Sequence, residues 1–174
     1  PYTTSKCPAE RLGTGNPVDL KMGRPEYKPS DVANRIHSGV TSQQWFCFYR
    51  TCRAGVFQTV STTPGAVCEV TAYVQSWSGT GYNFLSEVST EDARLNSQWF
   101  IAVDRGGATD AFAPGVLRSR AFTYYDGHYD KYVQISYRFQ ATGTRTTIFF
   151  ENLRLWPIPN NDNYLDDVSV RCHS

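Results

Sequence analysis

Apolar residues at every second position dominate the stretch from Arg53 to Trp77, RAGVFQTVSTTPGAVCEVTAYVQSW. The alternation continues on both sides of a turn at Thr63, Pro64 and Gly65. A period of two is typical of an antiparallel strand that is buried on one face, and a Pro-Gly pair between two such runs marks a turn. This stretch therefore predicts two neighbouring antiparallel strands.

Further strand-like segments follow one another along the chain, separated by turns rich in glycine and proline. No segment carries apolar residues at helical spacing over three turns. Strands at such spacing are typical of an all-β sandwich or barrel, and 174 residues suit one domain. We predict strands at residues 41–49, 54–61, 66–77, 84–90, 98–104, 116–123, 131–141, 144–151 and 164–171.

The first 34 residues have a different composition. They contain five of the nine prolines of the chain and three glycines, which prevent a long helix and weaken any central strand. We predict an extended proline-rich amino-terminal arm at residues 1–34 and a β-sandwich domain at residues 35–174. An arm of this length is expected to serve binding or assembly, or to pack as a loop over the sandwich.

The closing stretch, Tyr164–Val170, reads YLDDVSV. Alternation places Asp166 on the same face as Val168 and Val170, towards the core. A carboxylate at a core is costly unless a partner satisfies it, and calcium is one such partner because it prefers oxygen ligands. We predict a structural calcium at Asp166, with a hydrogen-bonded partner such as arginine as the alternative. Oxygen-rich segments at 104–110 and 160–163, which we predict to be loops, would complete the site.

These features, in this order, resemble the galactose-binding-like jelly-roll domains, especially the secreted carbohydrate-binding modules with a calcium-stabilised sandwich. The resemblance implies a jelly-roll β-sandwich of two antiparallel sheets that binds glycans on its concave sheet or on the loops at its edge. It covers roughly residues 35–172 and rests on Arg35–Gly39, Ala54–Val60, Thr63–Gly65, Thr71–Val74 and Tyr164–Val168.

Two of the predicted strands carry outward residues that suit sugars. Because the small apolar residues at 70, 72 and 74 are expected to face the core, the residues between them point outward. Aromatic rings stack on the C–H faces of sugars, and amides and guanidinium groups form hydrogen bonds with hydroxyls. Either the arm or a neighbouring subunit covers this face, or it is a glycan-binding platform formed by Tyr73, Gln75, Trp77, Gln134 and Arg138.

Five cysteines without a Cys-x-x-Cys pair favour disulfides over zinc, and hence an oxidising, extracellular compartment. Cys47 and Cys52 flank a four-residue loop whose geometry suits a bridge. Cys7 and Cys172 lie near the two termini, which often meet in a domain. We predict these two disulfides and a buried free thiol at Cys68.

Charge and motif content exclude several classes of function. The net charge is +1, with 17 basic and 16 acidic residues spread along the chain, so the basic stripe of a nucleic-acid-binding protein is absent. No apolar run approaches the length of a membrane span. The three histidines lack metal-ligand spacing and a nucleophile partner, so we do not predict an enzyme.

The sequence therefore predicts a secreted, non-catalytic module that binds polysaccharide or glycan through an aromatic-bearing sheet face. The alternative is a structural subunit of an extracellular filament or surface assembly that self-associates through its arm or by strand addition. An unpaired sheet edge supports this alternative, because it is a template for another chain.

Overall fold

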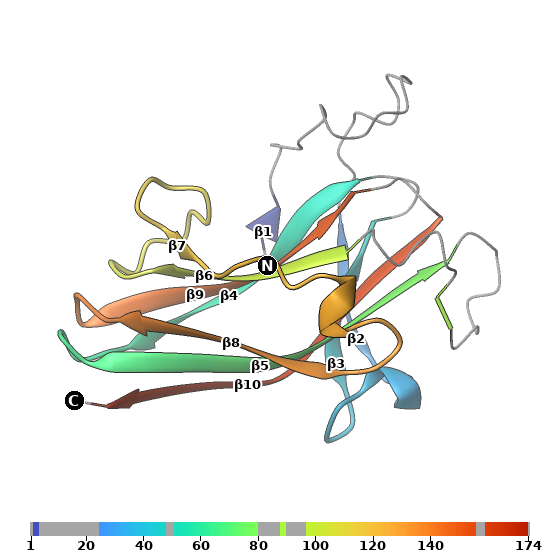
Figure 1. The fold of residues 1–174 in the computed structure, drawn as a ribbon, viewed down its shortest axis with the longest axis horizontal. Helices are drawn as coiled ribbons and strands as arrows, with labels where there is room; N and C mark the ends of the chain where they lie inside the picture. Colours follow the sequence, from blue (N-terminus) through green and yellow to red (C-terminus); the bar gives the residue numbers. More distant parts are fainter. Residues whose placement is uncertain are drawn as a thin grey trace.

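The computed structural model describes residues 2–3, 25–47, 51–79, 88–89, 97–155 and 159–173. There the chain forms two antiparallel sheets packed face to face (Figure 1), which confirms the predicted all-β sandwich. Sheet A contains, in spatial order, β1 (Tyr2–Thr3), β4 (Cys52–Ser61), β9 (Arg145–Arg154), β6 (Ser97–Asp104) and β7 (Leu117–Arg118). Sheet B contains β2 (Glu26–Ser30), β3 (Ser42–Phe46), β10 (Asn160–His173), β5 (Val67–Gly79) and β8 (Val133–Gln140).

The observed strands agree best with the predicted ones where apolar residues alternate over the longest stretch of sequence. β4 and β5 lie where predicted, and Gly65 in the turn between them has a φ of +88°, which glycine adopts without strain. The segment 160–163 is not a loop but the start of β10, and β7 replaces the longer strand predicted at 116–123. Most of the strand predicted at 84–90 lies outside the described residues. The helices of the described part are the short 3-10 turns η2 (Ala33–Arg35) and η4 (Tyr124–Asp126), and neither could cross a membrane.

The predicted arm at residues 1–34 contributes strands at both of its ends. β1 pairs with β4, and β2 pairs with β3 at the edge of sheet B. Pro29 lies within β2, where an edge strand tolerates the missing N–H because, among the described residues, one of its sides has no neighbouring strand. Residues 4–24 lie outside the described residues, so the division at residue 34 stays a prediction.

The core lies between the two sheets and collects the inward-pointing side chains of both. Trp45 of β3 and Trp99 of β6 are fully buried and meet edge to face, with ring centroids 5.2 Å apart. Such a contact adds about 0.5–1.5 kcal/mol to the free energy of burial. The smaller residues around them are Ala54, Val70, Ala72, Val74, Ile101, Val103, Ile135, Ile148 and Leu165.

At one end of the sandwich the inward positions change from apolar to polar. On β5 the inward-facing residues after Val74 are Ser76 and Ser78, and on β9 the inward-facing residues after Phe150 are Asn152 and Arg154, all of them buried. Hydrogen bonds connect this interior. Ser76 Oγ lies 2.8 Å from Ser97 Oγ and accepts a hydrogen bond from Trp99 Nε1 at 2.9 Å. Ser97 Oγ also accepts from Asn152 Nδ2 at 2.8 Å. Arg154 Nε donates to Asn163 Oδ1 at 2.9 Å.

A bulge in β10 reverses the face pattern of that strand. Asp166 lies opposite Tyr73, but Ser169 lies opposite Thr71, so three steps along β10 match two along β5. Asp166 follows the inward Leu165 and faces outward, and the extra residue after it brings Val170 back to the core. The prediction that Asp166 points to the core with Val168 is therefore wrong, and Val168 itself is 44% exposed.

The structure contains two disulfides in its described residues. Cys47 is bonded to Cys52, as the spacing predicts. Cys172 is bonded to Cys68 and not to Cys7, so both the predicted terminal bridge and the predicted free thiol at Cys68 are wrong. The two cysteines lie directly opposite each other on the neighbouring strands β5 and β10, a pairing that depends on strand register. Cys7 lies outside the described residues.

Removing the Cys68–Cys172 bridge is expected to destabilise the domain more than removing Cys47–Cys52. The sequence separations are 104 and 5 residues, and loop-closure entropy then gives losses of about 4.7 and about 2 kcal/mol. Guanidinium unfolding of the double alanine variants Cys68→Ala/Cys172→Ala and Cys47→Ala/Cys52→Ala measures both. Equal losses would contradict the entropic account, and non-reducing peptide mapping checks the pairing itself.

His128 is expected to make the stability of the fold depend on pH. Its side chain is fully buried, and burial, with the nearby charge of Arg154, lowers the pKa of the imidazole to about 3. The unfolded chain binds a proton near pH 6.5 that the folded chain does not bind, so stability falls as the pH drops below 6.5. At pH 5 the loss is about 2 kcal/mol, or a decrease of about 4–8 °C in Tm.

The test measures Tm between pH 7 and pH 5 for the wild type and for His128→Gln. The variant should lose this part of the decrease, because its amide does not titrate. The matched control, His173→Gln, removes an exposed histidine from the end of β10 and should keep the wild-type decrease. An unchanged slope in His128→Gln would show that another group causes the pH dependence.

Candidate functional site

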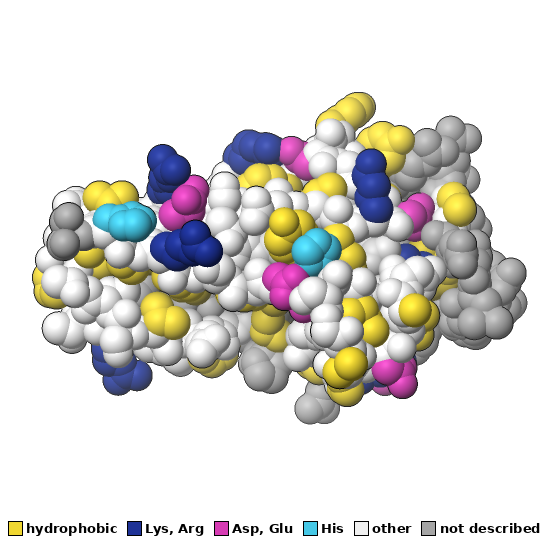
Figure 2. Space-filling model, turned by 90° about the horizontal axis from the view of Figure 1, so that it is seen from below, with side chains coloured by type: hydrophobic (Ala, Val, Ile, Leu, Met, Phe, Trp, Pro, Cys, Tyr) yellow, Lys and Arg dark blue, Asp and Glu magenta, His cyan; other side chains and the backbone are white. Residues whose placement is uncertain are grey.

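The outer face of sheet B, which points away from sheet A, carries rows of side chains set by strand register (Figure 2). Phe46 of β3, Asp162 of β10 and Trp77 of β5 lie in one row. The next row contains Lys28, Gln44, Tyr164 and Gln75. Figure 2 shows hydrophobic side chains and charges of both signs on this face.

The first hollow on this face has a volume of about 270 Å³, and we call it the Trp77 hollow. Its walls combine three aromatic rings with cationic, carboxyl and amide groups. The Arg35 guanidinium lies 5.5 Å from the ring centroids of both Trp77 and Tyr164, and Lys28 Nζ lies 5.3 Å from that of Phe46. The lining residues are Lys28, Ser30, Val32, Arg35, Gln44, Phe46, Trp77, Asn160, Asp162 and Tyr164.

Asp162 is the carboxyl group of the Trp77 hollow. Gln44 Nε2 donates to Asp162 Oδ1 at 2.6 Å and to the Tyr164 hydroxyl at 3.3 Å. Burial raises the pKa of Asp162, while the Gln44 hydrogen bond and nearby positive charges, Arg154 foremost, oppose that rise. Trp77 Nε1 is buried without a hydrogen-bond partner among the described residues. The hollow thus holds a carboxyl acceptor and a buried donor beside aromatic walls.

A loop at residues 31–39, which includes η2 and which we call the covering loop, crosses the middle of this face. Gln75 is fully buried beneath it and donates from Nε2 to the Asn34 carbonyl at 3.3 Å. The His37 ring stacks on Tyr73 with centroids 3.6 Å apart. The Tyr132 hydroxyl donates to the Arg35 carbonyl at 2.8 Å. The loop therefore separates Trp77 from Tyr73.

Two neighbouring carboxylates at the β10 bulge fasten the covering loop. Asp166 Oδ2 accepts from the backbone N–H groups of His37 and Ser38 at 2.9 and 3.2 Å. Asp167 Oδ2 lies 2.6 Å from His37 Nδ1, and its Oδ1 accepts from Ser38 Oγ at 2.7 Å. The hydrogen bonds from His37 and Ser38 lower the pKa of Asp167. Asp167 has a φ of +45°, a strained value that the bulge imposes.

A second hollow of about 260 Å³, the Tyr73 hollow, lies on the other side of the covering loop. It is lined by Glu69, Thr71, Tyr73, Gln134, Asp167, Ser169 and Arg171. Beside it, Arg138 Nε donates to Glu69 Oε1 at 3.0 Å, and both side chains are well exposed. An ion pair this exposed contributes little to stability.

The five residues predicted to form one platform are thus distributed over sheet B. Trp77 lines one hollow, Tyr73 and Gln134 line the other, Gln75 is covered, and Arg138 forms an ion pair. Sequence reasoning missed the other residues of the Trp77 hollow. Lys28, Ser30 and Val32 lie in the predicted arm and Asn160 and Asp162 in a predicted loop, whereas Gln44, Phe46 and Tyr164 lie in predicted strands whose pairing with β5 the sequence does not show. Extending the alternation of β10 back to Asn160 would have placed Asp162 and Tyr164 on one face.

The predicted calcium ligands have hydrogen-bond partners of their own in the structure. Asp166 accepts from the two backbone N–H groups of the covering loop. Asp104 Oδ1 accepts from the N–H groups of Gly106 and Ala108 at 2.8 and 3.1 Å. Among the described residues, no three histidine, cysteine or acidic side chains cluster as a metal site. The structural calcium at Asp166 stays a prediction.

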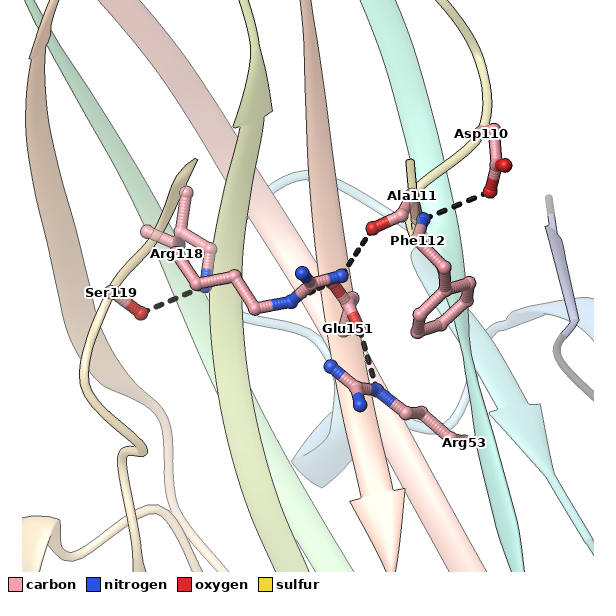
Figure 3. Close-up of polar contacts among 8 residues, drawn as sticks. Arg53, Asp110, Ala111, Phe112, Arg118, Ser119 and Glu151 are labelled. Carbon is pink, nitrogen blue, oxygen red and sulfur yellow. Dashed lines mark hydrogen bonds and ion pairs between the residues drawn. The ribbon is translucent and has the colours of Figure 1, made fainter. Parts of the chain in front are cut away.

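A separate charged cluster lies on the outer face of sheet A (Figure 3). Glu151 is fully buried, and its two carboxylate oxygens accept from Arg53 Nε at 2.8 Å and from Arg118 Nη2 at 2.9 Å. The ring of Phe112 lies beside both guanidinium groups, and its centroid is 4.8 Å from Arg53 Cζ and 5.3 Å from Arg118 Cζ. Arg118 also donates to the Ala111 carbonyl. These contacts fasten the segment 110–118 to the sheet.

Comparison with known proteins identifies the fold. No protein-family model and no curated protein sequence matches the chain. Among solved structures, TmCBM61 in complex with β-1,4-galactotriose is similar with a TM-score of 0.53 and 12% identity, over 86% of this chain and 88% of that one. A structure from a study of carbohydrate-binding modules of the β-sandwich superfamily has a TM-score of 0.50 and 12% identity, over 86% of this chain and 54% of that one.

The same fold also occurs in a cyclase. The cyclase of Fischerella sp. TAU, in complex with 4-(1H-indol-3-yl)butan-2-one, has a TM-score of 0.54 and 12% identity, over 99% of this chain and 85% of that one. At these identities the likeness concerns the fold alone. The fold of this chain is therefore similar to the β-sandwich of carbohydrate-binding modules, as the sequence resemblance predicts.

Proposed function

We propose that this chain is a non-catalytic glycan-binding module with a jelly-roll fold that holds a sugar residue in the Trp77 hollow. The observation that supports this most is the combination of aromatic walls with a carboxyl and an amide in one hollow of about 270 Å³. A sugar ring presents apolar C–H faces and polar hydroxyls to its binding site, and this hollow offers partners for both.

The polar groups of the hollow suit hydroxyls in both hydrogen-bonding directions. Asp162, when ionised, accepts hydrogen bonds from hydroxyl groups, and Lys28 Nζ donates to hydroxyl oxygens. The buried Trp77 Nε1 is a donor without a partner among the described residues, and such a group is costly unless a ligand satisfies it.

Binding without catalysis fits the acidic groups of the hollow. Glycosidases use two carboxyl groups about 5–9.5 Å apart, whereas Asp162 is the single carboxyl among the described residues that line this hollow. The two disulfides agree with an extracellular site of action, where glycans are abundant. The alternative role as a subunit of an extracellular filament or surface assembly stays a prediction.

Replacing Asp162 with asparagine is expected to weaken glycan binding while preserving shape. A hydrogen bond to a charged group contributes about 1.5–3 kcal/mol, so the Kd should rise about 10-fold or more. Affinity electrophoresis in gels that contain β-1,4-galactan, xylan or a β-glucan identifies the ligand and measures the retardation of each variant. β-1,4-Galactan heads this panel because TmCBM61 was solved with β-1,4-galactotriose.

The matched control is Arg171→Gln, which removes an exposed charge from the same sheet face outside the Trp77 hollow. It should keep wild-type retardation, and the Tm of both variants verifies that they are folded. Wild-type retardation of a folded Asp162→Asn variant would place sugar binding elsewhere. A wild-type protein that no polysaccharide retards would overturn the proposed function.

A further inference from the structure

We infer that the Trp77 hollow accepts the terminal residue of a glycan chain and not an internal segment. This inference rests on the proposed function and deepens it, because it names the class of glycan that the site selects. An internal segment needs a groove that is open at both ends, so that the chain can enter on one side and leave on the other. The described residues around the Trp77 hollow close one of these two sides.

The closed side follows from the row of outward residues on β5. Outward side chains two residues apart on a strand are separated by about 6.5 Å, so a chain that runs along β5 from Trp77 towards Tyr73 must pass over Gln75. Gln75 is fully buried, however, and its amide donates to the carbonyl of Asn34 in the covering loop. The position that would carry the next sugar residue is occupied by protein.

Arg35 forms the end wall on this side. Its side chain is 5% exposed, and its guanidinium lies against the rings of Trp77 and Tyr164. Its carbonyl accepts from Tyr132 of the segment before β8 and from Ser42 Oγ of β3 at 2.6 Å. Because both partners hold the backbone of η2, Arg35 is a fixed wall of the hollow.

The rest of the covering loop is fastened as firmly. The carboxylates of Asp166 and Asp167 accept from the backbone and side chains of His37 and Ser38, and His37 stacks on Tyr73. Displacing the loop to let a chain through would break these contacts and expose Gln75. A glycan therefore places its last residue against Arg35 and extends away from the covering loop.

The length of the ligand separates the two modes of binding. A groove gains affinity with each added sugar until its subsites are filled, whereas a hollow that binds a chain end is saturated by its last residue and the immediate neighbour. Isothermal titration calorimetry compares the disaccharide to hexasaccharide series of β-1,4-linked galactose, xylose and glucose. In the series that binds, we expect Kd to change less than about threefold, or about 0.7 kcal/mol, from disaccharide to hexasaccharide.

A Kd that falls about tenfold or more over the same range would overturn the inference while leaving glycan binding intact. The double variant Tyr132→Phe/Ser42→Ala, which removes both hydrogen bonds to the Arg35 carbonyl, is expected to gain length dependence because the end wall loosens. Arg171→Gln is its matched control, since it removes an exposed charge from the same sheet face outside the covering loop, and should behave as the wild type. If no member of any series binds, the proposed function fails, and this inference fails with it.

Discussion

The buried guanidinium of Arg154 links the two sheets at the end of the sandwich where the Trp77 hollow lies. It extends from β9 of sheet A and is fully buried. Its acceptors on β10 and β5 of sheet B are Asn163 Oδ1, Ser78 Oγ and the backbone carbonyls of Asp162 and Trp77, and the Tyr129 hydroxyl is a further acceptor. Burying a cation is costly without such partners, so Asn163 and Ser78 are buried here as partners of one arginine. Because the guanidinium binds the backbone of Trp77 and Asp162 from behind, it also sets the floor of the hollow.

The sequence predicted what depends on local alternation and missed what depends on register. β4 and β5 could be predicted because apolar residues alternate on both sides of a short turn. Asp166 was assigned to the wrong face because one extra residue in β10 reverses the pattern, and a bulge leaves no reliable signal in a single sequence. Cys68 and Cys172 occupy inward positions on two strands that are distant in sequence, so their bond was visible only once β5 and β10 were paired.

The candidate site was predicted only in part, because alternation shows which residues of one strand face outward but not which strands lie beside it. Trp77 was identified from its outward position on β5, but the neighbours that make a hollow around it come from β2, β3 and β10. The segment of β2 was predicted as part of the arm and the first four residues of β10 as a loop, because proline and asparagine are poor strand formers on average. An edge strand tolerates Pro29, and Arg154 satisfies Asn163, so tertiary contacts outweighed local preference at both places.

The bulge that made the predicted orientation of Asp166 wrong also contributes to the shape of the site. In a regular strand the residue after Asp166 would turn towards the core, whereas the bulge places Asp167 on the outer face beside Asp166. Both carboxylates therefore reach His37 and Ser38. A regular β10 would leave Asp166 as the only carboxylate of this pair at the covering loop. A single inserted residue thus strengthens the attachment of the loop that separates the Trp77 hollow from the Tyr73 hollow.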